Sequence, residues 1–301
     1  MPIALLLAFA LVACASTPGA DRPRFDASAR DAWHAARIKA LAAENGWLTL
    51  VGLDFLKDGE TTIGSSPECA LRYEHATAAR IGVFLKNGEC VAFQPAPGAE
   101  VTVDGVRVTN EIQLLADDAA ALANATPKML RNGPLAIMLV RRNGALALRV
   151  RDNASPVRTG FKGIPLYPFD PALVVEAEVV PAAAGATIAI TNVMGFVEQQ
   201  PLAATLRFEL AGRACALAAT EGSNGGFSIV FGDTTNGAET YGGGRFLEVG
   251  APVGARVTLD FNRAYNPPCC FTHYATCPLP PADNRLDAPI AGGERIPHSH
   301  E

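Results

Sequence analysis

From Trp47 onward, short apolar runs alternate with turn dipeptides at close intervals. Val, Ile, Leu and Phe recur with a period of two between these turns, which are Asp58-Gly59, Asn87-Gly88, Asp104-Gly105, Asn132-Gly133 and Asn143-Gly144. Asn-Gly and Asp-Gly supply the positive φ values that tight hairpin turns require. The pattern therefore predicts a mainly β fold built from antiparallel hairpins, without parallel βαβ units.

One helix is expected before the strands, over residues 26–46. Asp26 or Ser28 can cap its start, and Gly46 is placed to end it. The residues expected on its apolar face are Trp33, Ala36, Ala40 and Leu41.

A polar, Pro-rich passage divides the remaining chain into two strand-rich blocks. The first, residues 47–152, is expected to form a β-sandwich, and the second, residues 165–290, a separate antiparallel β domain. Residues 291–301 are expected to be a flexible tail.

The amino terminus is an apolar run that ends in Leu11-Val12-Ala13-Cys14. The run is too short to span a bilayer, which needs ~20 residues. A small residue before Cys is what lipoprotein signal peptidase requires, so we expect residues 1–13 to be a signal peptide, Cys14 to carry lipid and residues 14–25 to be a tether. Ala15 favours the outer membrane, with the protein facing the periplasm. An ordinary secretory signal cleaved near residues 15–20 is the alternative.

Composition narrows the class of partner. The chain is 49% hydrophobic and 18% charged, which is typical of a globular protein with a buried core. A net charge of −5 argues against nucleic acid as a partner. Gly242-Gly243-Gly244 precedes a strand-like run and not a helix, so it does not predict a phosphate-binding loop, and we expect no cofactor.

The first block resembles a forkhead-associated domain in the order of its strands. The matching runs are Thr61-Thr62-Ile63-Gly64, Ala70-Leu71-Arg72-Tyr73, Arg80-Ile81-Gly82-Val83, Cys90-Val91-Ala92-Phe93 and Val101-Thr102-Val103-Asp104-Gly105. The resemblance implies an antiparallel sandwich. It does not extend to phosphothreonine binding, because Ser65 stands where that family has Arg, and Asp104 would repel phosphate.

From Trp47 to about Ile290 the chain resembles the bacterial family catalogued as domain of unknown function 1684. The runs that carry the resemblance are Gly46–Leu53, Arg131–Ala136, Glu239–Gly242, Gly244–Leu247, Asp260–Cys269, Tyr274–Pro280 and Asn284–Leu286. The family implies no activity, so functional roles depend on the residues themselves.

Polar side chains gather between Phe231 and Pro281, at the predicted ends of strands. Asp233, Glu239 and Asp260 are candidate catalytic acids. The candidate ligand-binding residues beside them are Tyr241, Arg245, Asn262 and Arg263. The same groups could instead hold turns and salt bridges together.

Three cysteines follow in the same segment. Cys269 and Cys277 flank a Pro-rich loop and are expected to form a disulfide in an oxidising compartment. A zinc site or a Cys–His nucleophile using His273 is the competing interpretation. The prolines around the loop disfavour the helix that would align such zinc ligands, so we expect no metal.

The sequence thus supports two functional hypotheses. The first is an envelope lipoprotein that acts as a binding or scaffold module for a polar small molecule, a glycan or an envelope protein. The second is a carboxylate-dependent hydrolase, which would need two acids ~5–10 Å apart in one pocket.

Overall fold

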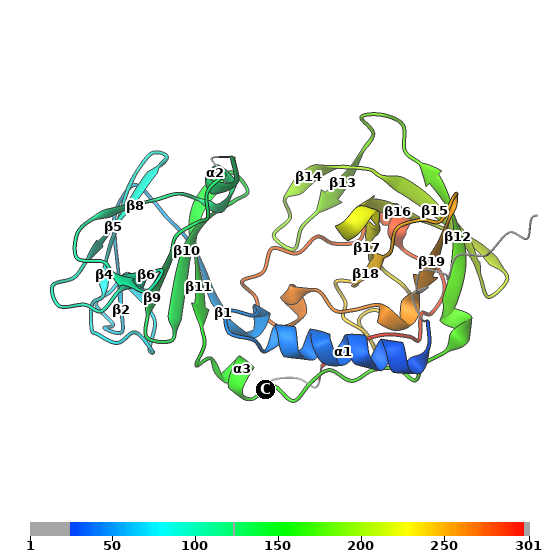
Figure 1. Ribbon diagram of the computed structural model, residues 1–301, viewed down its shortest axis with the longest axis horizontal. Coiled ribbons are helices and arrows are strands. Elements are labelled where there is room, and N and C mark those ends of the chain that lie inside the picture. Colours follow the sequence, from blue (N-terminus) through cyan, green and yellow to red (C-terminus); the bar gives the residue numbers. More distant parts are fainter. Residues whose placement is uncertain (1–24, 123, 298–301) are drawn as a thin grey trace, which may run out of the picture.

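The computed structural model describes residues 25–297 apart from residue 123. The chain forms two β lobes, and one long helix precedes them and runs along the second (Figure 1). Residues 153–164 connect the first lobe to the second. The first lobe comprises residues 50–152 and the second lobe residues 165–297. The expected signal peptide, Cys14 and residues 15–24 of the tether lie outside the described residues. In the described part of the chain, no helix combines the length and apolar character needed to cross a membrane.

Helix α1 (Ala27–Leu41) runs along the second lobe and ends at the first (Figure 1). The Asp26 carboxylate caps it, accepting the backbone N–H of Ala29 at 2.8 Å. The helix stops five residues before the predicted end at residue 46. Asn45 and not Gly46 takes the left-handed conformation, with φ of 58°. Gly46 is required for space, because a Cβ there would lie 2.4 Å from the Leu41 carbonyl oxygen.

The first lobe is a sandwich of two sheets. The six-stranded sheet has the order β1-β11-β10-β9-β6-β7 and the five-stranded sheet the order β3-β2-β4-β5-β8. The bounds are β1 (Leu50–Phe55), β2 (Gly59–Gly64), β3 (Leu71–Arg72), β4 (Gly82–Asn87), β5 (Cys90–Pro95), β6 (Thr102–Val103), β7 (Val106–Arg107), β8 (Ile112–Leu114), β9 (Met129–Asn132), β10 (Leu135–Arg142) and β11 (Ala145–Asp152). Short helices η1 (Trp47–Thr49), α2 (Asp117–Leu122) and α3 (Pro156–Thr159) flank the strands.

The turn dipeptides account for most of this lobe's hairpins. Asn143 and Gly144 have φ of 52° and 76° and join β10 to β11, where Arg142 pairs with Ala145. Asp58-Gly59 is different, because β1 and β2 belong to different sheets and the chain crosses over there. The facing side chains of the two sheets form the core, in which the Phe84 and Phe93 rings lie 5.0 Å apart.

The second lobe is built on one curled antiparallel sheet, with the order β18-β17-β16-β15-β12-β19. Its strands are β12 (Val174–Pro181), β15 (Ala204–Leu210), β16 (Arg213–Glu221), β17 (Phe227–Phe231), β18 (Arg245–Val249) and β19 (Arg256–Asp260), and the hairpin β13 (Thr187–Thr191) and β14 (Val197–Pro201) lies beside it. The edge strands β18 and β19 contact each other, so the sheet closes around its core. Short helices η2 (Pro171–Leu173), η3 (Ser223–Gly225), η4 (Phe261–Arg263), η5 (Pro268–Cys270) and η6 (Ala282–Asn284) lie in the connections.

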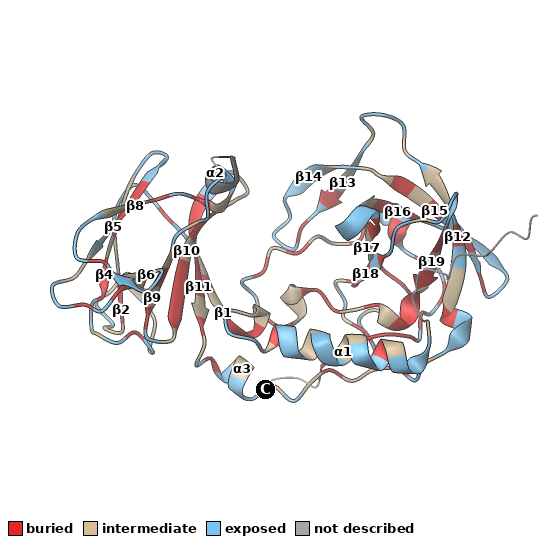
Figure 2. Cartoon of the chain, viewed as in Figure 1, coloured by how far each residue is buried: buried red, intermediate tan, exposed pale blue. Residues whose placement is uncertain are grey.

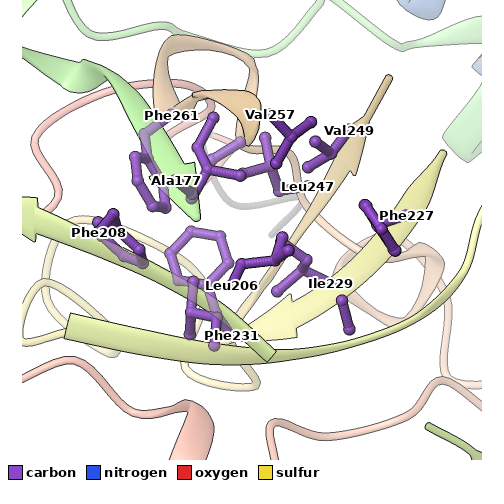
Figure 3. Packing of buried hydrophobic residues seen from close by; sticks show 14 of the residues in the cluster. Ala177, Leu206, Phe208, Phe227, Ile229, Phe231, Leu247, Val249, Val257 and Phe261 are labelled. Atoms are coloured by element: carbon purple, nitrogen blue, oxygen red, sulfur yellow. The ribbon is translucent and has the colours of Figure 1, made fainter. Parts of the chain in front are cut away.

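Aromatic packing fills the curled sheet. The Phe261 ring lies 5.7 Å from Phe208 and 5.5 Å from Phe231 (Figure 3). Buried residues are concentrated inside both lobes, whereas much of the outer face of α1 is exposed (Figure 2). The predicted mainly β class, with an amino-terminal helix, a sandwich and a second antiparallel unit, is confirmed.

The prediction of a flexible tail is wrong for residues 291–297. Glu294 is fully buried, and its backbone N–H donates to the Ala264 carbonyl at 2.8 Å. The Arg295 N–H donates to the Pro165 carbonyl at 2.9 Å. The segment is ordered because the second lobe supplies partners for its backbone and its buried carboxylate. Residues 298–301 lie outside the described part of the chain.

The core of the second lobe generates a stability prediction. Phe261→Ala removes a ring that is 0% exposed and should lower the free energy of unfolding by about 3–5 kcal/mol. Phe196→Ala is the matched control, since Phe196 is 47% exposed and its truncation should change stability by less than ~0.5 kcal/mol. Urea unfolding of both variants tests the comparison, and equal losses would contradict the described core.

Candidate functional site

The predicted acid Asp233 forms a buried structural ion pair. Its Oδ2 accepts from Arg245 Nη2 at 2.8 Å, and both side chains are 0% exposed. Its Oδ1 accepts from the backbone N–H and the hydroxyl of Thr235, at 2.8 and 2.6 Å. Arg245 also donates to the carbonyls of Ile290 and Gly292. These contacts hold the turn after β17 and the carboxy-terminal segment against the curled sheet.

The other two acids have separate partners. Asp260 Oδ1 accepts from the backbone N–H of Asn262 at 3.1 Å and caps helix η4, while its Oδ2 lies 3.3 Å from Arg263 Nε. Glu239 Oε2 lies 3.7 Å from Arg295 Nη2, and the Glu239 side chain is 53% exposed. All three carboxylates are thus engaged in a local turn or an ion pair.

The remaining predicted binding residues also have structural partners. The Asn262 side chain accepts from the Asp170 N–H at 2.8 Å and donates to the Asp170 carbonyl at 2.9 Å, which fastens the start of the second lobe. The Tyr241 hydroxyl donates to the Cys269 carbonyl at 3.3 Å. The structure therefore does not bring the seven predicted residues around one cavity.

A different part of the molecule contains a ligand-sized groove, which we call the interlobe groove. Its volume is about 460 Å³, within the range of small-molecule sites. It lies where α1 ends and the chain enters the first lobe. Its lining residues are Trp33, Arg37, Ala40, Leu41, Asn45, Gly46, Trp47, Arg151, Glu248 and Tyr265. None of the three predicted acids is among them.

One wall comes from α1 and the segment after β19. The Trp33 and Tyr265 rings lie 6.2 Å apart. The Arg37 guanidinium lies over the Tyr265 ring, 4.4 Å from its centroid. Arg37 is fixed there because it donates to the buried Glu294 carboxylate at 2.5 Å and to the Asn266 carbonyl at 2.7 Å. This wall is therefore a rigid, partly cationic aromatic surface.

The other wall comes from η1 and β11. Arg151 lies 5.4 Å from the Trp47 ring centroid and donates through Nη1 to the Gly46 carbonyl at 2.7 Å. No carboxylate pairs with Arg151 among the described residues. Burial lowers the pKa of Arg151 and, more strongly, lowers that of its neighbour Arg149 to about 10. The Arg149 Nε is buried without a hydrogen-bond partner in the described structure.

One acid faces these groups. Glu248 Oε1 accepts from the Ser228 hydroxyl at 2.9 Å and from the Tyr265 hydroxyl at 3.1 Å. Burial, and next the Glu248 carboxylate, raise the pKa of Tyr265, so the phenol stays protonated and acts as a donor. The groove can therefore hold a molecule by stacking, charge and hydrogen bonding.

Sequence reasoning missed this groove. Trp33 was expected on the helix face, and the Tyr265 segment lies in the polar stretch, but no spacing rule brings residues 33 and 151 together. The residue types themselves are the signal that could have indicated a binding surface here. Trp47 precedes the strands, and Arg149 and Arg151 alternate on a strand whose opposite face is apolar.

The structure does not contain the predicted Cys269–Cys277 disulfide. Both are free thiols, and the Cys269 backbone N–H donates to the Cys277 sulfur at 3.2 Å. The hydrogen bond from the Cys277 thiol outweighs burial and lowers the pKa of Cys269 to about 7. The loop thus brings the two sulfurs together through hydrogen bonds, without a covalent bridge. The described residues hold no group of three or more potential metal ligands, and His273 is exposed.

The two environments of the predicted acids can be distinguished by mutation. Asp233→Asn leaves the fully buried Arg245 without a counter-charge, which should cost about 3–5 kcal/mol in free energy of unfolding. Glu239→Gln, in an exposed pair, should change it by less than ~1 kcal/mol. Thermal and urea unfolding measure both values. A small effect of Asp233→Asn would contradict its structural role.

The chain is similar to one protein family and to several solved structures. No curated protein matches it. The solution structure of an uncharacterized protein of Haloarcula marismortui is 31% identical, with 46% of this chain and 78% of that chain covered and a TM-score of 0.38. Two solved structures concern FHA domains: one, from a study of phosphothreonine-dependent interactions, is 17% identical, and the alignment covers 32% of this chain and 79% of that chain at a TM-score of 0.21.

The other is the FhaA FHA domain complexed with the intracellular domain of Rv3910, also 17% identical, with 33% of this chain and 97% of that chain covered and a TM-score of 0.22. Residues 159–295 match the family described as "Protein of unknown function (DUF1684)", the same family that the carboxy-terminal motifs resemble. Residues 159–295 of the chain therefore belong to this family.

Proposed function

We propose that the protein is a binding module whose interlobe groove takes a polar ring compound bearing an anionic group, with acidic saccharides as the fitting class. The observation that carries the proposal is the position of Arg151. It lies at the groove against Trp47 and has only a backbone carbonyl as its hydrogen-bond partner in the described structure.

The aromatic walls favour a ligand with a ring. Trp33, Trp47 and Tyr265 line the groove with rings that can pack against the apolar C–H face of a pyranose. Because Arg37 is held by Glu294, the wall it shares with Tyr265 is formed before a ligand arrives. Preformed walls lower the entropic cost of binding.

The charge pattern favours an anionic substituent. A guanidinium offers a planar fork of donors that suits a carboxylate, and burial strengthens such an interaction. Arg151 supplies positive charge on one side of the groove, while Glu248, which also lines it, can accept hydrogen bonds from ligand hydroxyls. This arrangement suits a uronic acid better than a neutral sugar or a cation.

The hydrolase alternative has less support. Its candidate acids are engaged by Arg245, by Arg295 and by the cap of η4, and none of them lines the groove; they are Asp233, Glu239 and Asp260. Within the groove, Glu248 is the acid, so the pair of carboxylates that glycosidase chemistry uses does not occur among its lining residues.

We also propose that the module is attached by lipid on Cys14 to the outer membrane and faces the periplasm. The support is the Leu11-Val12-Ala13-Cys14 sequence that ends the apolar run. Several acyl chains, at ~0.8 kcal/mol per buried methylene, would make the attachment stable. A groove on the exposed body would then be available to envelope glycans.

Binding is tested by thermal shift and calorimetry with glucuronate oligomers against neutral glucose oligomers. An acidic ligand at 100 times its dissociation constant should add ~2.7 kcal/mol of stability. Arg151→Gln removes a charged donor worth ~1.5–3 kcal/mol, so the dissociation constant should rise roughly 10–100-fold. Arg207→Gln, at an exposed position of β15, is the matched control and should bind normally.

Two outcomes would overturn the proposal. Equal stabilisation by acidic and neutral oligomers would show that the ligand's charge is not recognised. An unchanged dissociation constant in the Arg151→Gln variant would show that the ligand does not bind in the interlobe groove.

The membrane attachment has its own test. Cys14→Ala should leave the precursor uncleaved and without incorporated palmitate, because the modified sulfur is missing. Metabolic labelling and fractionation of producing cells measure both properties. Normal maturation of the variant would refute lipidation at Cys14.

A further inference from the structure

The loop between residues 267 and 281 places two thiols beside the phenol of Tyr241. None of these three side chains lines the interlobe groove, although Trp47 of the groove packs against the same apolar cluster as the two cysteines. The Cys269 N–H donates to the Cys277 sulfur at 3.2 Å, and the thiol of Cys277 hydrogen-bonds the sulfur of Cys269. The Tyr241 hydroxyl donates to the Cys269 carbonyl at 3.3 Å, and its closeness to the Cys269 thiol helps to lower the pKa of that thiol. A thiol whose pKa is lowered in this way is suited to carry negative charge.

The two sulfurs differ in accessibility. Cys277 is only 6% exposed and packs in an apolar cluster with Leu50 and Ala275, whereas Cys269 is half-buried at its edge. This asymmetry matches the division of labour in thiol–disulfide exchange. An accessible thiolate attacks first, and a protected thiol beside it resolves the mixed disulfide.

We propose that Cys269 and Cys277 form a thiol–disulfide exchange site, with Cys269 as the attacking thiolate, Cys277 as the resolving thiol and Tyr241 as the hydrogen-bond donor to Cys269. The substrate class is a disulfide on a small molecule or a peptide. This site does not depend on the proposed binding function of the groove.

The exchange balances with the substrate disulfide as the oxidant. The Cys269 thiolate attacks one sulfur of R–S–S–R′, a bond forms between Cys269 and that sulfur, and R′S⁻ leaves and takes a proton from water. Cys277 then gives up its proton, and its thiolate attacks the Cys269 sulfur and releases RS⁻, which is protonated in turn. One substrate disulfide is reduced to two thiols while the protein pair is oxidised to one disulfide.

Oxidation has a structural consequence. The loop that it closes contributes Thr272, whose hydroxyl donates to the Leu50 carbonyl of β1 at 2.9 Å, and Phe271, which packs in the cluster beneath α1. The loop is the orange segment between the two lobes in Figure 1. A disulfide would therefore stiffen the contact by which the second lobe holds the first.

The test treats the reduced full-length chain with oxidised glutathione and maps products by mass spectrometry. The wild type should form a disulfide that joins the peptides containing Cys269 and Cys277. Cys277→Ser should accumulate glutathione on Cys269, because nothing resolves the adduct. Cys269→Ser should form neither product at Cys277, which burial protects.

A pH series and a conservative variant separate reactivity from folding. Since the pKa of Cys269 is about 7, its rate of modification should rise through neutral pH and level off above it. Tyr241→Phe keeps the ring but removes a group that lowers the pKa of Cys269, so less thiolate is present and the rate at neutral pH should fall by up to about fivefold. Cys90→Ser, which removes an exposed thiol elsewhere, should leave the rate of Cys269 modification unchanged.

The proposal fails if Cys90 is modified while Cys269 remains free in the Cys277→Ser variant. It also fails if the wild type never joins Cys269 to Cys277 at any glutathione ratio, or if Tyr241→Phe reacts like the wild type.

Discussion

The buried ion pair between Arg245 and Asp233 is the interaction on which the rest of the second lobe depends. Arg245 donates to the carbonyls of Ile290 and Gly292 as well as to Asp233. These bonds fix the carboxy-terminal segment, which brings Glu294 into the interior. Glu294 in turn holds Arg37 of α1 at 2.5 Å, and Arg37 lies over Tyr265 in the groove wall. A continuous set of polar contacts thus connects the interior of the curled sheet to the proposed binding surface.

Burial explains why the charged groups in this set need so many partners. A charge removed from water costs several kcal/mol unless partners replace the lost hydration. Here the partners are Thr235, a counter-ion and backbone carbonyls. The groove differs in this respect, because Arg151, which lines it, has a single backbone carbonyl as its hydrogen-bond acceptor in the described structure. Donor capacity that remains unused at a ligand-sized groove is the physical basis of the proposed function.

Local sequence signals predicted those parts of the fold that depend on interactions between residues close together in the chain. Asn143-Gly144 forms its hairpin, and Asp26 caps α1, because turn and cap preferences act over a few residues. Three expectations depended on tertiary context instead. Gly292, Gly293 and Glu294 are buried only because distant groups bind this segment, Cys269 and Cys277 are adjacent without a bridge, and each predicted acid is engaged by its own ion-pair partner. The groove joins residues more than a hundred positions apart, which no spacing pattern reveals.

Intrinsic fluorescence tests the central claim most directly. The chain contains two tryptophans, Trp33 and Trp47, and both line the interlobe groove. Titration with a glucuronate oligomer should produce a saturable change in tryptophan emission, which is lost in the Arg151→Gln variant over the same concentration range. Saturable binding measured by calorimetry with no change in emission would place the ligand elsewhere and contradict the account.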